Sequence, residues 1–303
     1  MPLTEAQKEA RLQGLGGSDM ATILGLNPYQ QAHELCLIKM GAMEAPDLSE
    51  KDAVLFGHLL EEPIAALYTE RTGKKVRRVN VTKHHKKYPF LIGHVDRDVV
   101  GERRGLEIKN VGFRMAPLWG KDGSADVAES YIPQVMHYMM VVDYEAWDVA
   151  AMIGGQECRI YHLERDKEWD ELLIDTAHEF WQRVENEEPP SIDYQHASAK
   201  ELLQKLYAKT DGTVVTFPDE LWHWHQVWQD AAKTKLQMEK VIEACRARFL
   251  DLMRDSSVGL LPDGTGYVRS LVKVKAHAVE ANEYMAMKYS KKPPTAKLES
   301  IPK

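Results

Sequence analysis

LIGHVDRDVV, residues 91–100, and GLEIKNV, residues 105–111, are two short runs in which apolar and polar side chains alternate. The polar segment GERR separates them, and alternating runs with so short a connection are typical of a β-hairpin. Residues i and i+2 of a strand lie on one face, so Glu107 and Lys109 project together while Ile108 points into the core. We therefore expect a hairpin that carries a carboxylate and an ammonium group side by side.

A second carboxylate lies on the other strand of this hairpin. Asp96 is across the turn from Glu107, and two converging carboxylates are what a hard divalent cation such as magnesium requires. A neighbouring lysine such as Lys109 can orient the attacking water or help to deprotonate it. The same spacing also fits a cross-strand salt bridge on a solvated face. Asp98, two residues on, would share a strand face with Asp96, so spacing alone leaves both interpretations and both aspartates open.

The segments around the hairpin alternate between helical and strand patterns. Helices are predicted at 32–43, 49–72, 130–141 and 164–186, and a second hairpin at 146–153 and 157–163. Apolar faces are predicted for two of these helices, with Leu55, Leu59, Leu60, Ile64, Leu67 and Tyr68 in 49–72, and Trp169, Leu172, Leu173, Phe180 and Val184 in 164–186. This order favours an α/β fold with a central mixed β-sheet flanked by helices.

Three local signals mark helix ends and breaks. Gly73 is expected to end the helix at 49–72, and Ser18 or Asp19 can cap a helix that follows the turn GLGG. Pro133 is expected to break the helix at 130–141 locally.

The Pro- and Ser-containing segment at 189–199 has the composition of a linker. It divides the chain into a core, residues 1–188, and a C-terminal extension, residues 200–303, with a long helix and a β-hairpin. In the extension a helix is predicted at 219–253, with the segment 199–208 as its packing partner and the hairpin around Pro262-Asp263-Gly264. The tail KKPPTAKLESIPK is expected to be poorly ordered.

Composition limits the class of protein. Apolar residues make up 44% of the 303 residues and charged residues 28%, which is typical of a globular protein. No apolar run approaches the roughly 18 residues of a membrane span, and the N-terminus lacks the apolar segment of a secretory signal, so we expect a cytoplasmic protein without a membrane partner. Cys36, Cys158 and Cys245 are far apart in sequence, which argues against a disulfide framework or a zinc site.

Positive charge is concentrated in one segment. The formal net charge of −7 argues against a nucleic-acid partner, but residues 71–88 carry eight Lys or Arg and no acid. That run could form a phosphate-facing stripe or a solvated loop and strand. Trp222, Trp224 and Trp228 could stack bases, although their helical spacing favours packing. His223 and His225 diverge on a helix, which favours a surface position over a metal pair.

Five motifs then occur in a characteristic order. They are Arg11 with GGSD at 16–19, Gly57 with Glu61, Asp96, Glu107-Ile108-Lys109, and Tyr131 with Gln134. Over roughly residues 8–185 the chain resembles the phage-type (YqaJ-like) exonuclease family, which includes phage lambda exonuclease. The resemblance implies a restriction-endonuclease-like core. The chain departs from the family in the sequence around Asp96, where His94 and Val95 precede the aspartate and Arg97 follows it.

The resemblance assigns a role to each motif. It implies that Asp96, Glu107 and the Ile108 carbonyl bind Mg²⁺, with Mn²⁺ as a substitute. Lys109 would activate the water, and Glu61 and Gln134 would lie near the metal site, with Glu62 as a rival of Glu61. Arg11 and Ser18 would hold the 5′ phosphate of the degraded strand, and Arg114 is a weaker candidate for a further phosphate contact. Arg suits that role through its bidentate fork.

The activity that the resemblance implies is two-metal, 5′→3′ digestion of one strand of linear double-stranded DNA, which leaves 3′ overhangs for phage-type homologous recombination. It also implies a homotrimer and a single-strand annealing recombinase as partner. Two alternatives use the same residues differently. A nicking or single-strand endonuclease on the same fold would also cut closed circles, and a non-catalytic DNA-binding module would digest nothing.

Overall fold

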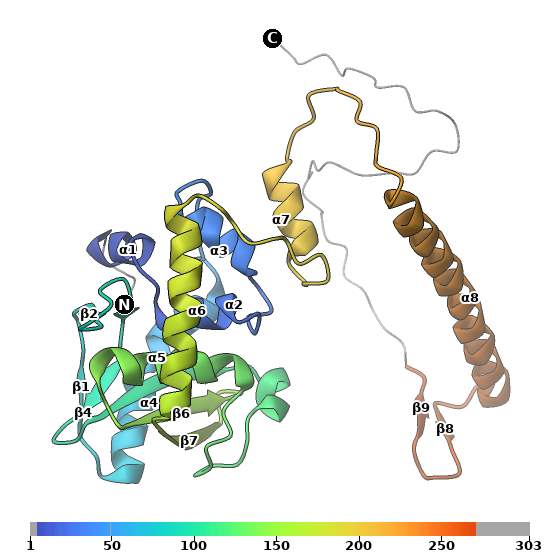
Figure 1. The fold of residues 1–303 in the computed structure, drawn as a ribbon. Coiled ribbons are helices and arrows are strands. Elements are labelled where there is room, and N and C mark those ends of the chain that lie inside the picture. The colour runs from blue at the N-terminus through green and yellow to red at the C-terminus, as the bar shows by residue number, and fades with distance from the viewer. Residues whose placement is uncertain (1–4, 49, 271–303) are drawn as a thin grey trace. The chain divides into compact units, whose positions relative to one another are not determined.

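The computed structural model describes residues 5–48 and 50–270 of the chain (Figure 1). The chain divides into two compact units, Met1–Leu206 and Tyr207–Lys303. Within the described residues no helix is both long enough and apolar enough to cross a membrane.

A five-stranded sheet forms the centre of the first unit, in the order β1-β4-β5-β6-β7. Its strands are β1 (Val76–Arg78), β4 (Arg97–Val99), β5 (Arg104–Val111), β6 (Ala146–Ile153) and β7 (Glu157–Glu164). β5 runs parallel to β6 along its whole length, whereas β4 pairs with β5, and β7 with β6, in antiparallel fashion. The predicted mixed sheet flanked by helices is confirmed, and so is the second hairpin.

The first hairpin is shorter than predicted. The β4–β5 ladder consists of the pairs Arg97–Leu106 and Asp98–Gly105, and the continuous strand expected at 91–100 is wrong. Its first part is β3 (Ile92–Gly93), which pairs with β2 (Lys83–His84) instead. The break has a tertiary cause, because Ile92 N donates to the Leu15 carbonyl at 2.9 Å and so ties this part of the chain to the Gly-rich turn.

Helices cover both faces of the sheet. The helices of the first unit are α1 (Glu5–Leu12), α2 (Gly17–Ile23), α3 (Ala32–Lys39), α4 (Asp52–Thr72), α5 (Ile132–Val142), α6 (Lys167–Glu185) and α7 (Ala199–Leu206), with 3-10 turns at Phe113–Leu118 and Glu129–Tyr131. Alternate residues of β6 serve the two faces: Trp147 and Val149 pack in the core that contains α5 and α6, and Ala150 packs with Ile64 and Tyr68 of α4.

Some details of the helices differ from the prediction. Leu55 and Leu59 of α4 and Leu172 of α6 are exposed, because the core beneath α4 is formed around Ile64 and Tyr68 in its second half. Gly73 ends α4 as expected, with φ of 71°. Pro133 causes no break, because it lies in the first turn of α5, where its missing N–H has no helical partner to lose.

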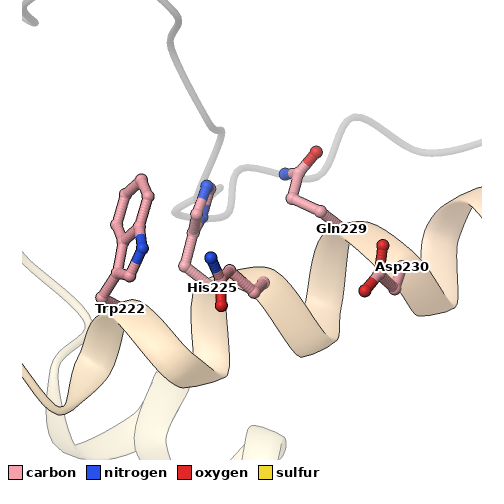
Figure 2. Close-up of a pocket in the computed structure, with 5 residues that line it drawn as sticks. Trp222, His225, Gln229 and Asp230 are labelled. Atoms are coloured by element: carbon pink, nitrogen blue, oxygen red, sulfur yellow. The ribbon is translucent and has the colours of Figure 1, made fainter.

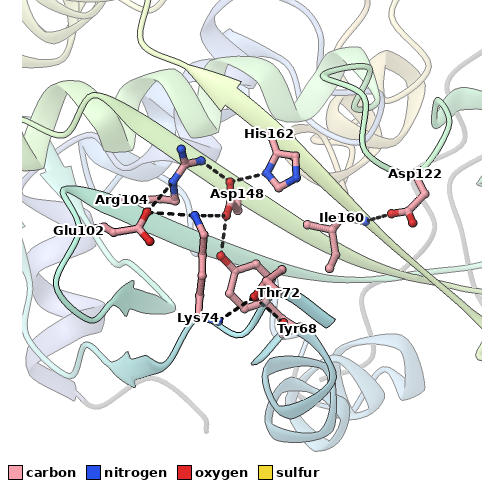
Figure 3. Close-up of polar contacts among 9 residues, drawn as sticks. All are labelled: Tyr68, Thr72, Lys74, Glu102, Arg104, Asp122, Asp148, Ile160 and His162. Atoms are coloured by element: carbon pink, nitrogen blue, oxygen red, sulfur yellow. Dashed lines mark hydrogen bonds and ion pairs between the residues drawn. The ribbon is translucent and has the colours of Figure 1, made fainter. Parts of the chain in front are cut away.

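A buried polar cluster fastens α4 to the sheet (Figure 3). Asp148 of β6 is fully buried and accepts a hydrogen bond from the Tyr68 hydroxyl of α4 at 2.5 Å. His162 Nδ1 of β7 lies 2.8 Å from the other carboxylate oxygen, and Arg104 of β5 also donates to it. Three strands and one helix therefore meet at a single satisfied carboxylate, which stabilises the position of α4.

The division of the chain falls later than the predicted linker at 189–199. Asp193 N donates to Gln31 Oε1 at 2.9 Å, and His196 Nε2 lies 2.8 Å from the Asn27 carbonyl, so this segment is held on the first unit. α7 belongs to the same unit, because Ala199 and Leu202 are buried and Lys205 lies 3.6 Å from Glu34. The sequence predicts this segment as the partner of the long helix of the extension, whereas its buried side chains belong to the first unit.

The second unit contains the predicted long helix and hairpin, α8 (Leu221–Met253), β8 (Val258–Leu260) and β9 (Gly266–Val268). The aromatic rings of Phe249 and Tyr267 lie 4.4 Å apart and join the helix to the hairpin. The predicted disordered tail lies outside the described residues.

Candidate active site

Glu107 lies at the centre of a group of polar side chains from β5, α5 and the segment before β4. It is only 3% exposed. Its Oε1 lies 2.6 Å from Lys109 Nζ and accepts a hydrogen bond from Gln134 Nε2 at 2.9 Å. Its Oε2 is buried and has no hydrogen-bond partner among the described residues. A buried carboxylate oxygen without a donor is costly, so this atom is placed for a ligand of positive charge.

Asp96 faces the backbone of the same strand. Its Oδ2 accepts a hydrogen bond from the Ile108 N–H at 2.9 Å. Burial, and then the negative charge of Glu107, raise the pKa of Asp96 to about 8. The N–H and C=O of one strand residue point to the same side, so the Ile108 carbonyl is directed to the Asp96 side of β5. The two carboxylates and this carbonyl belong to one small region.

Lys109 is surrounded by acceptors and an aromatic ring. Its ammonium donates to Gln134 Oε1 at 3.2 Å and lies 4.8 Å from the centre of the Tyr131 ring. Burial by itself would lower the pKa of Lys109, but the carboxylates of Glu107 and Asp96 outweigh it and raise that pKa. Lys109 is therefore a charged donor at neutral pH, suited to orienting a water or a phosphate oxygen.

The structure separates the two competing aspartates. Asp98 Oδ2 accepts from Arg77 Nη2 at 3.1 Å, and its Oδ1 accepts from the Tyr144 hydroxyl at 3.2 Å. Both oxygens are thus engaged away from Glu107. The structure brings Asp96, and not Asp98, together with Glu107 and Lys109.

Glu61 reaches the same region from α4 through a buried arginine. Arg97 donates to Glu61 and also to Glu62 at 2.6 Å, and Arg78 contacts both acids. The side chain of Glu61 is 17% exposed and that of Glu62 is 66% exposed. The negative charge of Glu61 adds to the effects that raise the pKa of Asp96. Of the two rivals, Glu61 is the less exposed, and it is the one whose charge is seen to act on Asp96.

The Gly-rich turn packs directly against Gln134. A Cβ on Gly17 would lie 2.8 Å from Tyr138 Cε1 and 3.0 Å from Gln134 Cγ, so only glycine fits. α2 begins at Gly17, and Asp19 accepts from the Gly16 N–H at 2.9 Å, so Asp19 acts from the third helical position and not as the cap residue itself. Ser18 is exposed one residue beyond the contact with Gln134.

Lys39 of α3 holds this turn in shape. Its Nζ donates to the Gly14 carbonyl at 2.8 Å and to Asp19 Oδ2 at 2.7 Å, and it also donates to the Arg11 carbonyl. The Arg11 side chain is exposed, and its charge contributes to lowering the pKa of His94, whose main cause is burial. Arg11 is therefore close enough to act electrostatically on His94, two residues before Asp96.

Sequence reasoning missed Lys39, Tyr138 and Arg97. Tyr138 accepts from Gln134 Nε2 at 3.0 Å and so helps to fix the amide. Its position four residues after Gln134 on a predicted helix was a signal that could have found it. Arg114, by contrast, lies in the exposed 3-10 turn after β5 and takes no part in the hydrogen-bonded group described above.

The basic run at 71–88 divides into two parts. Lys74, Arg77 and Arg78 pair with Glu102, Asp98 and Glu62, respectively, and are part of the fold. Lys86 and Lys87 are exposed in the turn between β2 and β3. Lys75 is exposed as well, so among the described residues of this run Lys75, Lys86 and Lys87 are the exposed lysines that could form the phosphate-facing stripe that the sequence suggested.

The residues present fit a magnesium ion. No group of three or more His, Cys, Asp or Glu side chains in the described part of the chain forms a complete metal cage. Mg²⁺ does not require one, because it is commonly held by one or two carboxylates and completes its shell with water and substrate oxygens. Asp96, the unpartnered oxygen of Glu107 and the Ile108 carbonyl supply such a partial set.

The fold and the site define a mixed α/β domain with an Asp immediately before β4 and a Glu-x-Lys motif on the neighbouring strand β5. Residues 7–145 match the model of the YqaJ-like viral recombinase domain. The match includes Arg11, Ser18, Asp96, Lys109 and Gln134.

A curated relative, the uncharacterized protein YqaJ of Bacillus subtilis (strain 168), is 37% identical over 204 residues. The match covers 66% of this chain, and the chain spans 62% of that relative's length. Among solved structures, the alkaline exonuclease LHK-Exo from Laribacter hongkongensis is 18% identical with a TM-score of 0.49, over 68% of this chain and 98% of the other. A phage-related exonuclease from Haemophilus somnus 129PT is 14% identical with a TM-score of 0.42, over 65% and 99%.

Proposed function

We propose that the first unit is a magnesium-dependent deoxyribonuclease that acts in phage-type recombination. The observation that carries this proposal is the buried, unpartnered Oε2 of Glu107 beside Asp96 and Lys109. The match of residues 7–145 to the model of the YqaJ-like viral recombinase domain supports a role in recombination. Asp96, Glu107 and the Ile108 carbonyl would hold the metal, which when bound polarises the phosphate and lowers the pKa of a water.

The side chains around the metal ligands perform the other steps. Lys109 orients the attacking water, and Gln134 keeps Lys109 and Glu107 in a fixed arrangement through one amide. The buried Arg97 holds Glu61 near the site. Because these groups are tied by hydrogen bonds before substrate arrives, they need little reorganisation in the transition state.

We further propose that the enzyme acts from DNA ends, in the 5′→3′ direction, and leaves 3′ overhangs. Arg11 and Ser18 would hold the 5′ phosphate, and the contact of Gly17 with Gln134 supports this by placing the turn beside the site. A guanidinium and a hydroxyl are suitable phosphate donors. The fit of the turn to Gln134 fixes the distance between the end of the strand and the bond to be cut.

Timed digestion of end-labelled duplex DNA, with and without Mg²⁺, tests the reaction. We expect Asp96→Asn and Lys109→Ala each to lose activity by about 100-fold or more, the scale of removing a group that acts in the transition state, while DNA binding persists. Asp98→Asn is the matched control and should keep most activity, because Asp98 contacts Arg77 and Tyr144 instead. Loss in Asp98→Asn with activity in Asp96→Asn would contradict the assignment.

DNA substrates that differ at the 5′ end test the proposed 5′→3′ direction of digestion. Linear duplex with a 5′ phosphate should be degraded faster than duplex with a 5′ hydroxyl, and Arg11→Ala should reduce that preference. Equal cleavage of covalently closed circles would instead support a nicking endonuclease, and absence of any digestion with Mg²⁺ or Mn²⁺ would support a DNA-binding module without catalysis.

A further inference from the structure

The start of α5 contacts Lys109 with two side chains. Tyr131 is the last residue of the 3-10 turn Glu129–Tyr131 and comes directly before the first residue of α5. Gln134 follows it by three residues, and residues three apart are neighbours on the surface of a helix. Lys109 Nζ lies 4.8 Å from the centre of the Tyr131 ring and donates to Gln134 Oε1 at 3.2 Å. One helix start therefore contacts the same ammonium group twice.

The Tyr131 ring covers a side of the Lys109 ammonium that hydrogen bonds leave open. An ammonium group has three N–H donors. Among the described residues, Glu107 Oε1 at 2.6 Å and Gln134 Oε1 at 3.2 Å account for two of them. A cation over the face of an aromatic ring is attracted to it. The third N–H is left for a water or a phosphate oxygen, and the ring limits the directions in which the flexible lysine stem can carry it.

A buried tryptophan holds the Tyr131 ring in place. Trp119 is only 5% exposed, and its ring centre lies 5.3 Å from that of Tyr131. The Trp119 ring also lies 5.5 Å from the ring of Tyr161 on β7, which is fully buried. Aromatic rings at such distances attract one another and pack in defined arrangements. Trp119 and Tyr131 together are called the aromatic brace below.

The aromatic brace is attached to the edge of the sheet. The segment after Trp119 lies along β7, where the Gly123 N–H donates to the Ile160 carbonyl at 2.8 Å and the Ile160 N–H donates to Asp122 Oδ1 at 2.6 Å (Figure 3). Arg159 Nη1 donates to the Trp119 carbonyl at 3.1 Å. The sheet therefore holds the brace through contacts that do not involve the lysine of the site.

The second lysine–tyrosine contact of the described residues has different surroundings. Lys87 Nζ lies 5.0 Å from the centre of the Tyr88 ring, but Lys87 is exposed in the turn between β2 and β3. The side chain of Lys109, in contrast, is only 20% exposed. The ring of Trp222 on α8 is 64% exposed beside a surface pocket (Figure 2). A ring attracts a cation more strongly where both are desolvated, so the contact of Tyr131 is the one suited to fix a side chain.

We infer that Tyr131 is a positioning residue of the proposed nuclease. Its ring, supported by Trp119, directs the Lys109 ammonium toward the water or phosphate oxygen that this group orients. This role rests on the proposed function of the first unit. Because the contact is with the ring centre, the ring and not its hydroxyl carries the effect. Loss of the ring therefore slows the chemical step and leaves the binding of DNA unchanged.

Steady-state digestion of linear duplex DNA by the full-length chain with Mg²⁺ tests this role. Tyr131→Leu should lower kcat by about 5- to 30-fold, the factor that corresponds to one partly buried cation–π contact, with KM for DNA nearly unchanged. Tyr131→Phe keeps the ring and should retain kcat within about twofold. Tyr88→Leu is the matched control, because it removes the exposed contact with Lys87, and it should leave kcat unchanged.

Two further kinetic measurements separate positioning from a merely structural role. Phenylalanine analogues with an increasing number of ring fluorines at position 131 keep the shape of the ring but weaken its attraction for a cation. The value of kcat should fall with each added fluorine. In the Lys109→Ala background, Tyr131→Leu should cause no further loss of activity, because the ring acts through Lys109.

Proton NMR of the metal-free chain measures the contact without any reaction. The ring current of Tyr131 should move the resonances of the Lys109 ε-methylene protons upfield, since the ammonium lies over the ring. That shift should remain in Tyr131→Phe and disappear in Tyr131→Leu. The spectrum of Lys109→Ala identifies the resonances, because they are missing from it.

The possible results distinguish this role from the nuclease assignment. If the unmodified chain digests DNA and Tyr131→Leu has the same kcat, or if kcat does not change along the fluorine series, Tyr131 is not a positioning residue and the nuclease assignment stands. If Tyr131→Leu fails to fold, the fluorine series decides alone, because it preserves the shape of the ring. If the unmodified chain digests nothing with Mg²⁺ or Mn²⁺, the nuclease assignment is wrong, and this role of Tyr131 with it.

Discussion

The side chain of Gln134 connects Glu107 and Lys109 of the candidate active site. Its NH₂ group donates to Glu107 and to the Tyr138 hydroxyl, and its carbonyl accepts from Lys109. Because the two ends of an amide differ, this set of partners fixes which end faces which residue. A glutamate or a leucine at this position would lose at least one of these contacts, so Gln134 is suited to hold Lys109 and Glu107 in position.

At the residue scale, the raised pKa of Asp96 predicts a pH dependence of stability. The pKa is raised from 3.8 to about 8 in the folded chain. Between these values the folded state binds more protons than the unfolded state, so the free energy of unfolding falls as pH rises through this range. Urea unfolding without divalent metal, between about pH 5 and about pH 8, should show a steeper fall for the unmodified chain than for Asp96→Asn. Equal slopes would contradict the buried, protonated Asp96.

Gly17 provides a second prediction at this scale. Gly17→Ala places a Cβ against Tyr138 and Gln134 and should lower the free energy of unfolding by about 1–3 kcal/mol, as overpacking does. Gly112→Ala is the control, since a Cβ there meets no atom within 4 Å. Chemical denaturation of both variants measures the difference, and a Gly17→Ala variant as stable as Gly112→Ala would show that the turn can move away from Gln134.

At the scale of the element, α4 combines two glycines with opposite requirements. Gly57 lies inside the helix, with no atom within 4 Å of an added Cβ, whereas Gly73 ends the helix with φ of 71°. Gly57→Ala should therefore raise the free energy of unfolding by about 0.5–1 kcal/mol. Gly73→Ala should lower it by about 1 kcal/mol, because the left-handed conformation strains an L side chain. Thermal unfolding of the two variants should shift in opposite directions, and a shift in the same direction would contradict this reading of the helix.

The elements show which parts of the fold the sequence could predict. Local signals were sufficient for the end of α4 at Gly73 and for the hairpin of β6 and β7, because each depends on neighbouring residues. The break in 91–100 could not be predicted, since it depends on Leu15, which lies far away in sequence and pairs with that segment. The apolar pattern of α4 predicted burial along its whole length, but the sheet covers only the part around Ile64 and Tyr68.

The same distinction applies to the site. Glu107 and Lys109 could be predicted from their spacing on one strand, and the order of the motifs indicated Asp96, Glu61 and Gln134. The choice between Asp96 and Asp98 required the partners Arg77 and Tyr144, which come from other segments. Lys39 gave no sequence signal, because its contacts with Gly14 and Asp19 form only when α3 packs beside the turn.

At the scale of the whole molecule, the boundary after Leu206 predicts that the first unit folds by itself. Residues 1–206 contain both apolar cores and the complete candidate site. We expect this fragment to unfold cooperatively, with a stability within about 1 kcal/mol of that of the same unit in the full chain, or about 2–4 °C in Tm. Calorimetry of the fragment and of the full chain measures this directly.

A shorter fragment is the matched control. Truncation after Ser198 removes Leu202, which is buried with 1% exposure, and should cost at least about 2 kcal/mol, as loss of a buried leucine side chain does. If both fragments were equally stable, α7 would not be part of the first unit.

The short ladder between β4 and β5 makes the candidate site a fork in the sheet. The ladder stops at the pair Arg97–Leu106, whereas β5 stays paired with β6 through all eight residues. One prong, with Glu107 and Lys109, is therefore fixed to the middle of the sheet. The other prong, with Asp96, continues into β3 and is tied to the Gly-rich turn through Ile92 and Leu15. Under the proposed function, a strand end held at the turn would therefore be connected to the Asp96 side of the site through the pairing of Leu15 with residues 91 and 92.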